Sequence, residues 1–219
     1  MRAFRKKTFY STTNKIILTN ILIFIVFTFL LIINEKVIDY FAVKPANIFE
    51  GKMMWTIFTS MFLHANLSHL FVNMVSLFFI GNFVEKLIGK KRMLLFYLLS
   101  GIIASLFFVF LSLIFKSEYN VYAVGASGAI FALASMLMVI VPKLPVFVFF
   151  IIPMPLWGAM LFLLFGLWII SYFAGLPIGN TAHFGGFVTG LIYGIYLRIK
   201  YNRKVKILNL YLTRARAFS

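Results

Sequence analysis

Four polar side chains lie within apolar stretches of this sequence and have the chemical types that acyl transfer needs. Ser127 stands in a Gly-Ala-Ser-Gly segment, and His183 follows Ala182. His69 and Asn73 are four residues apart, which places them on one face of a helix. A histidine at the depth of a serine can accept the hydroxyl proton and so activate a weak nucleophile. We therefore predict Ser127 as nucleophile and His183 as general base.

The residues around Ser127 suit a tetrahedral oxyanion. Ser127 is predicted to open a helix, where free backbone N–H groups and the positive end of the dipole favour negative charge. Gly125 and Gly128 leave room for a substrate backbone to approach. The side chains of His69 and Asn73 can supply further donors, an effect of several kcal/mol in other hydrolases.

A carboxylate that could complete a triad is not expected. The chain has five acidic residues, of which Glu85 lies twelve residues beyond Asn73, roughly 18 Å further along a helix. The other four fall in predicted loops. We expect a Ser-His dyad, with His183 oriented by packing and by an aromatic neighbour. The chain has no cysteine, so disulfides and thiolate-bound metals are excluded, and the chemistry requires no metal or cofactor.

The composition defines the surroundings of these residues. Hydrophobic residues make up 63% of the 219 residues and charged residues 12%, whereas soluble domains are about half apolar and a quarter charged. Mean hydropathy is +1.00. A chain this short cannot hide so much apolar surface from water, so we predict an all-α, polytopic membrane protein.

Apolar runs long enough to cross a bilayer, about 20 residues each, indicate six helices. The predicted spans are 16–33, 67–88, 93–115, 126–141, 155–173 and 182–201. They form a compact membrane domain over 16–201, flanked by basic tails at 1–15 and 202–219. Pro153 and Pro155 interrupt a longer apolar run, so 146–152 is predicted as an interfacial or re-entrant segment.

The distribution of charge predicts the orientation. With both termini cytoplasmic in the cell membrane, the inner segments hold 17 of the 21 basic residues, as the positive-inside rule requires. This distribution explains the net charge of +16 without nucleic acid and implies contact with the lipid bilayer. Spans two, four and six then all begin at the outer face, which brings the four polar side chains to one depth. The fourth span is short, roughly 24 Å against a core of about 30 Å, so Ser127 is expected below the surface in a water-filled cavity.

Several residues are interpreted as structural. Gly186 and Gly190 are spaced for close helix packing between spans six and four. His64 lies outside the second span and is interpreted as a loop hydrogen-bonding residue. Glu85 stands beside Lys86 at the inner end of that span, which favours a structural contact.

Three motifs in this order resemble the rhomboid intramembrane serine proteases. They are His64-x4-His69-x3-Asn73, the Gly-Ala-Ser-Gly segment at Ser127, and Ala182-His183 with Gly186-x3-Gly190. The resemblance covers about residues 55 to 201. It implies that Ser127 is the nucleophile and His183 the base, and that His69, Asn73 and backbone N–H groups form the oxyanion hole. It further implies structural roles for His64 and Glu85, a partly embedded first loop over 34–66, and lateral substrate access controlled by the fifth span and the loop after it.

Two positions depart from the family pattern. Many members have Trp-Arg in the first loop, where this chain has Trp55-Thr56. Many also have a tyrosine stacked on the catalytic histidine, where this chain has Phe131, which can stack but has no hydroxyl group.

The predicted function is an intramembrane serine endopeptidase whose partners are transmembrane protein substrates. Two alternatives remain. A small transporter would show internal repeats and intramembrane acids, and neither is found. A non-catalytic rhomboid-like protein that binds membrane helices would lack Ser127 or His183, and both are present. The sequence leaves the substrate, its cleavage site and the oligomeric state open.

Overall fold

The computed structural model describes residues 11–149, 151–174 and 179–217, with side chains described through Leu212. Most of the predicted basic tail at 1–15 therefore lies outside the described residues. So do 175–178, the middle of the loop that follows the fifth predicted span, together with the role expected of that loop.

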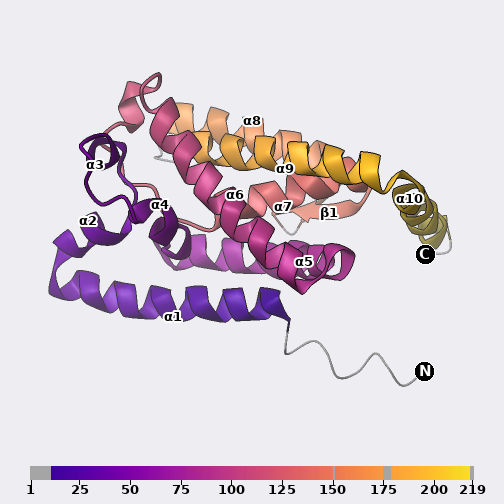
Figure 1. Cartoon of the computed structure of the whole chain (residues 1–219), viewed down its shortest axis with the longest axis horizontal. Helices are drawn as coiled ribbons and strands as arrows, with labels where there is room; N and C mark the ends of the chain where they lie inside the picture. The colour runs from indigo at the N-terminus through magenta and orange to yellow at the C-terminus, as the bar shows by residue number, and fades with distance from the viewer. Residues whose placement is uncertain (1–10, 150, 175–178, 218–219) are drawn as a thin grey trace.

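The bundle consists of six helices that run side by side in alternating directions (Figure 1). They are α1 (Thr12–Ile33), α5 (Leu67–Ile88), α6 (Lys90–Leu111), α7 (Ser127–Ile140), α8 (Leu156–Ala174) and α9 (Asn180–Lys200). In the described part of the chain, α1, α5, α6 and α8 are long and apolar enough to span a membrane. The predicted fourth and sixth spans fall outside that group: α7 has 14 residues, and α9 is rich in glycine and polar residues. The prediction of a polytopic helical membrane bundle is confirmed.

Short helices cover one end of the bundle, which we call the dyad end because α5, α7 and α9 all begin there (Figure 1). Most of them form the loop between α1 and α5. These elements are η1 (Glu35–Val37), α2 (Ile38–Phe41), α3 (Pro45–Phe49), α4 (Thr56–Thr59), η2 (Ser60–Phe62) and, between α6 and α7, η3 (Lys116–Glu118). The predicted first loop is thus largely helical.

The segment between α7 and α8 departs from the all-α prediction. It forms an antiparallel hairpin of β1 (Pro145–Val148) and β2 (Ile152–Pro155), in which Val146 pairs with Met154. Four prolines in this segment lack the N–H group that a helix requires, whereas the valine, isoleucine and phenylalanine residues favour extended backbone. The prediction for 146–152 missed this pairing, although the break before α8 lies within one residue of the expected position.

The region predicted as a basic tail continues as a further helix, α10 (Asn202–Ala217). It follows α9 after a single residue, Tyr201, and lies at the end of the bundle opposite the dyad end (Figure 1). We call this the α10 end.

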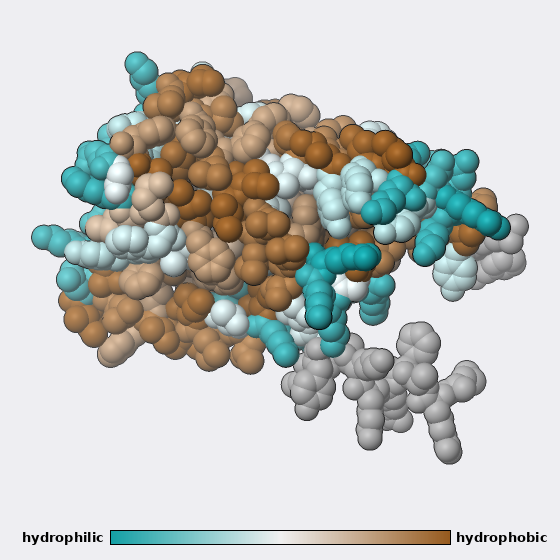
Figure 2. All heavy atoms as spheres, in the orientation of Figure 1, coloured by the Kyte–Doolittle hydropathy of each residue, from teal (hydrophilic) through white to brown (hydrophobic). Residues whose placement is uncertain are grey.

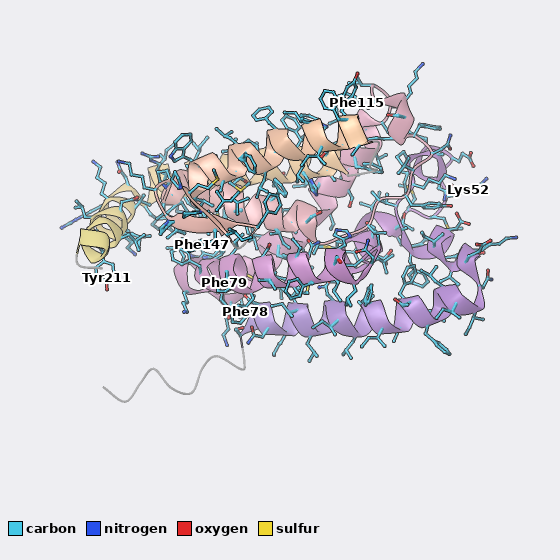
Figure 3. The ribbon with its side chains drawn as sticks, turned by 180° about the vertical axis from the view of Figure 1, so that it is seen from behind. Lys52, Phe78, Phe79, Phe115, Phe147 and Tyr211 are labelled. Carbon is cyan, nitrogen blue, oxygen red and sulfur yellow. The ribbon has the colours of Figure 1, made fainter. Side chains whose placement is uncertain are left out.

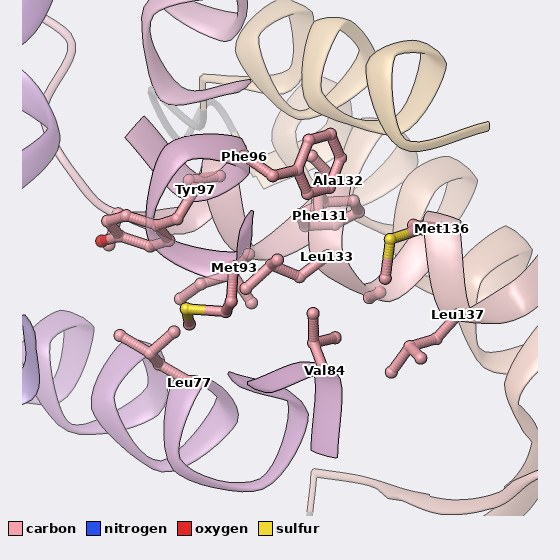
Figure 4. Packing of buried hydrophobic residues seen from close by; sticks show 14 of the residues in the cluster. Leu77, Val84, Met93, Phe96, Tyr97, Phe131, Ala132, Leu133, Met136 and Leu137 are labelled. Atoms are coloured by element: carbon pink, nitrogen blue, oxygen red, sulfur yellow. The ribbon is translucent and has the colours of Figure 1, made fainter. Parts of the chain in front are cut away.

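The core lies at the centre of the bundle, around α7. Leu77 of α5, Met93 of α6 and Leu133 of α7 meet there and are fully buried (Figure 4). On the face shown in Figure 2 the middle of the bundle is mainly apolar, and hydrophilic residues gather toward the two ends. An apolar belt between polar ends is the surface that a bilayer requires.

Candidate active site

Ser127 and His183 meet between α7 and α9. Ser127 is the first residue of α7, and its Oγ lies 2.8 Å from Nε2 of His183, in the first turns of α9. His183 is buried, whereas Ser127 is only partly buried. Ser127 therefore keeps some exposed surface while its partner is shielded.

The surroundings of His183 favour a dyad. If Nε2 accepts the serine proton, the neutral imidazole must carry its own proton on Nδ1. His183 Nδ1 is buried and has no hydrogen-bond partner in the described part of the chain, so no carboxylate bonds to it there. The ring is instead stacked on Phe131, with centroids 4.5 Å apart and planes 11° from parallel. An aromatic ring thus orients the imidazole where a triad would use an acid.

Glycine residues bring α7 and α9 close enough for this contact. A Cβ atom at Gly186 would overlap the carbonyl of Gly128, and one at Gly190 would overlap the carbonyl of Ala132. The Ser135 hydroxyl adds a hydrogen bond of 2.9 Å to the Phe187 carbonyl across the same interface. We call this contact the α7–α9 interface. Its backbone-to-backbone approach is the small-residue packing expected of membrane helices.

His69 approaches the serine from α5. A Cβ atom built on Gly125 would lie 3.0 Å from His69 Nε2 and 3.6 Å from Ser127 Oγ, so the imidazole lies beside the nucleophile. Gly125 has a φ of +127°, which L side chains rarely adopt, and its N–H donates to the Ser60 carbonyl at 2.9 Å. His69 Nδ1 accepts from the Ala65 N–H at 3.4 Å, so in the neutral ring Nε2 carries the proton. The site therefore has a donor near the serine that comes from outside α7.

Asn73 and His64 both contact His69. Asn73 is buried, and its Nδ2 donates to the His69 carbonyl at 2.8 Å, which leaves a second N–H on that amide. The His64 ring packs edge-on against that of His69, 5.1 Å between centroids. His64 is 4% exposed and neither of its nitrogens has a hydrogen-bond partner among the described residues. Burial, followed by the proximity of His69, lowers the pKa of His64 to about 3, and the backbone of Phe62 in the same loop partly offsets that fall.

Glu118 was missed by sequence reasoning. Its Oε2 accepts a hydrogen bond of 2.7 Å from the hydroxyl of Thr181, two residues before His183. Burial raises the pKa of Glu118, and the bond from Thr181 partly offsets that rise. The contact joins the loop before α7 to the first turn of α9. Glu118 and Thr181 are 63 positions apart, and no sequence spacing predicts a contact over that separation. The one signal in the sequence was that Glu118 is among only five acidic residues.

Glu85 lies at the α10 end, far from the dyad, and a structural contact was predicted for it. Its carboxylate accepts from the N–H groups of Thr12 and Thr13 and from the Thr13 hydroxyl, at 2.9 to 3.1 Å. Glu85 therefore caps the first turn of α1, where unpaired N–H groups and the helix dipole favour a negative charge.

No group of three or more potential metal ligands occurs among the described residues. The side chains described above provide a serine hydroxyl, an imidazole base and nearby donors. A hydroxyl and an imidazole within hydrogen-bonding distance, at a helix N-terminus, form an arrangement typical of nucleophilic acyl transfer.

Comparison with known proteins shows the family to which the chain is similar. The model of the Rhomboid domain matches residues 51–200. RHOMBOID-like protein 1 of Arabidopsis thaliana is 35% identical over 67% of this chain and 35% of its own length. Inactive RHOMBOID-like protein 8 of the same plant is 32% identical over 64% of this chain and 37% of its own length. The rhomboid protease GluP of Bacillus subtilis is 33% identical over 72% and 29%.

The chain spans less than half the length of these three relatives, one of which is described as a protease and another as inactive. The match to the family model covers more than half of this chain and includes α5, α7 and α9, which carry the three motifs. The chain belongs to the rhomboid family.

Proposed function

We propose that this protein is an intramembrane serine endopeptidase that cuts transmembrane segments of other proteins with Ser127 and His183. The observation that carries the proposal is the 2.8 Å contact between Ser127 Oγ and His183 Nε2, with the serine partly exposed at the start of α7. This geometry is suited to proton transfer from hydroxyl to imidazole.

The reaction follows from the atoms present. Ser127 Oγ attacks the carbonyl carbon of the scissile peptide while its proton moves to His183 Nε2. The resulting oxyanion is stabilised by backbone N–H groups at the start of α7, by His69 Nε2–H and by the free N–H of Asn73. The protonated His183 then donates to the leaving nitrogen, the C–N bond breaks, and an acyl-enzyme remains. A water molecule, deprotonated by His183, hydrolyses the ester, and the proton returns to Ser127. No metal or organic cofactor takes part.

Substrate reaches the dyad sideways, past α8. Only four of the 19 residues of α8 are buried, so its movement disrupts few contacts. A substrate helix must unwind to present an extended peptide, and backbone groups freed in lipid are costly. Segments with helix-breaking or small residues near the cut are therefore preferred. The dyad end faces the outside of the cell and both termini face the cytoplasm, because the basic residues gather at the other end of the bundle.

The test is cleavage of a model transmembrane substrate by the purified chain in proteoliposomes. Wild-type protein should cleave, and Ser127→Ala should reduce the rate by at least about a thousandfold. Equal cleavage by both would remove the assigned nucleophile. Binding of the substrate helix without cleavage by either would favour a non-catalytic role such as the name of the inactive relative suggests.

A further inference from the structure

The helix α10 has one face packed against the bundle. Val205, Leu208 and Leu212 recur with helical spacing and pack against the main core. Asn209, on the same side, donates from Nδ2 to the carbonyl of Ile140, the last residue of α7, at 2.7 Å. The inner face of α10 thus makes a direct contact with the helix that begins at Ser127.

The contact between Asn209 and Ile140 stabilises the end of α7, which is a short helix. At 14 residues α7 is about 21 Å long, less than the roughly 30 Å of a hydrocarbon core. Its last carbonyl groups have no partner within the helix and would be costly to leave unpaired in an apolar environment. Asn209 bonds to one of them, and Arg198 of α9 bonds to the preceding carbonyl, that of Val139, at 3.1 Å.

The opposite face of α10 combines apolar and basic residues. Ile207, Leu210 and Tyr211 are 58%, 60% and 70% exposed, and the nearby Arg203, Lys204 and Lys206 are exposed as well. The sequence of α10 contains five basic residues and no acid, and the last acid of the whole chain is Glu118. Hydrophilic colour therefore covers this end of the molecule in Figure 2, and Tyr211 projects from it in Figure 3, opposite Lys52 at the dyad end.

We propose that the outer face of α10, formed by Arg203, Lys204, Lys206, Ile207, Leu210 and Tyr211, binds the headgroup layer of anionic phospholipids. Amphipathic helices with basic and apolar residues insert at the boundary between headgroups and acyl chains. Because α10 follows α9 after one residue and lies at one end of the bundle, it is placed near the surface of a bilayer that surrounds the bundle. The lipid-bound helix in turn holds Asn209 against the end of α7.

Two other occupants fit less well. A second copy of this face would oppose cation to cation, and nucleic acid offers nothing for the exposed isoleucine and leucine. Anionic lipid satisfies both components, because phosphate accepts the basic groups and the acyl region accepts the apolar ones. The proposal goes beyond the peptidase function and holds whether or not the dyad is active.

The absence of cysteine allows a site-specific probe. A single Leu210→Cys substitution, labelled with an environment-sensitive fluorophore, is placed in nanodiscs of phosphatidylcholine with increasing fractions of phosphatidylglycerol. We expect the emission to shift to shorter wavelength as the anionic fraction rises. The variant R203Q/K204Q/K206Q should need at least about a threefold higher anionic fraction for the same shift, since each cation near an anionic surface strengthens binding about fivefold.

The matched control is K36Q/K52Q/K116Q, which removes three cations from the loops at the dyad end and should leave the shift unchanged. An equal response in pure phosphatidylcholine, or no effect of the α10 triple variant in protein that elutes and melts like wild type, would overturn the proposal. A response that depends on protein concentration or on added oligonucleotide, and not on anionic lipid, would also overturn it in favour of self-association or nucleic-acid binding.

Discussion

The helices α7 and α8 are both apolar, yet the protein uses them in opposite ways. In α7, 11 of 14 residues are buried, whereas in α8 only four of 19 are. Trp157 and Phe165 of α8 are 51% and 54% exposed, and Tyr172 near its end is 83% exposed. Alanine, serine and glycine allow α7 to pack backbone to backbone, whereas large side chains on α8 face outward.

This difference shows that hydropathy alone does not tell which helix can hold a catalytic group. A bilayer accepts both helices, but a reacting pair must keep its geometry to within a fraction of an ångström. Close packing at the α7–α9 interface provides that precision. Few residues of α8 are buried, which suits the lateral access that we propose for the substrate.

The strongest test of the difference between the two regions is a glycine-to-alanine substitution in each, one at the α7–α9 interface and one in α8. Gly186→Ala introduces a Cβ atom that overlaps the Gly128 carbonyl, whereas Gly166→Ala in α8 meets nothing within 4 Å. We expect Gly186→Ala to lower kcat by about a hundredfold or more, because a shift of about 1 Å in the dyad costs that much. It should also lower the Tm. Peptidase kinetics and thermal unfolding of both variants measure the effect.

Gly166→Ala is the control and should leave activity within about twofold of wild type, with a slightly higher Tm because alanine favours helix. If the two variants behaved alike, the α7–α9 interface would not be the element that positions the dyad.

The second prediction concerns the Glu118–Thr181 contact. Glu118→Ala removes the acceptor 2.7 Å from Thr181, so the turn that carries His183 loses its contact with the loop before α7. We expect kcat to fall about tenfold, the size of one lost hydrogen bond to a charged group, with KM nearly unchanged. Glu118→Gln keeps an acceptor oxygen and should restore most of the rate. A change confined to KM would mean that Glu118 acts in substrate binding. No rescue by glutamine would mean that the negative charge of Glu118 is needed.

The third prediction concerns stability and pH. His64 has a pKa of about 3 in the folded protein against an ordinary value of 6.5, so the unfolded chain takes up a proton first as the pH falls. Its contribution to stability is complete above about pH 6.5 and decreases below it, by about 1.4 kcal/mol per pH unit until about pH 3. Denaturant unfolding in detergent at pH 7.5 and 5 measures this slope. His64→Gln should have a shallower pH dependence; an unchanged slope would show that His64 titrates normally.

The smallest effect is expected at Phe131. Phe131→Tyr keeps the ring stacked on His183 and adds a hydroxyl group of the kind found in many family members. We expect kcat to change by no more than about threefold, because ring stacking already orients the imidazole. Phe131→Leu, which removes the ring, should cost more than the tyrosine variant. A large gain with tyrosine would mean that the phenyl ring positions His183 poorly.

Much of the fold could be predicted because a helix that crosses a lipid bilayer needs a run of about 20 apolar residues. Helices occupy all six predicted positions, and the conjunction of polar residues in apolar runs pointed to Ser127 and His183. The structure places these two side chains within hydrogen-bonding distance; their catalytic roles stay a prediction.

The rest depended on contacts that spacing does not encode. The bonds of Glu85 to α1 and of Glu118 to Thr181 join segments 73 and 63 residues apart. The hairpin of β1 and β2 was missed because its prolines marked a break without showing what replaces the helix. The helix α10 did have a signal, the spacing of Val205, Leu208 and Leu212, but the density of charge around it suggested a tail.

The central claim is that His183 activates Ser127. Labelling by a fluorophosphonate probe tests it directly, because the probe reacts with an activated serine and mass spectrometry locates the adduct. We expect one adduct, on Ser127, in the wild-type chain, and loss of at least about 99% of the labelling rate in His183→Ala, as the loss of a general base predicts. An adduct on another serine, or equal labelling of Ser127 without the imidazole, would contradict the account.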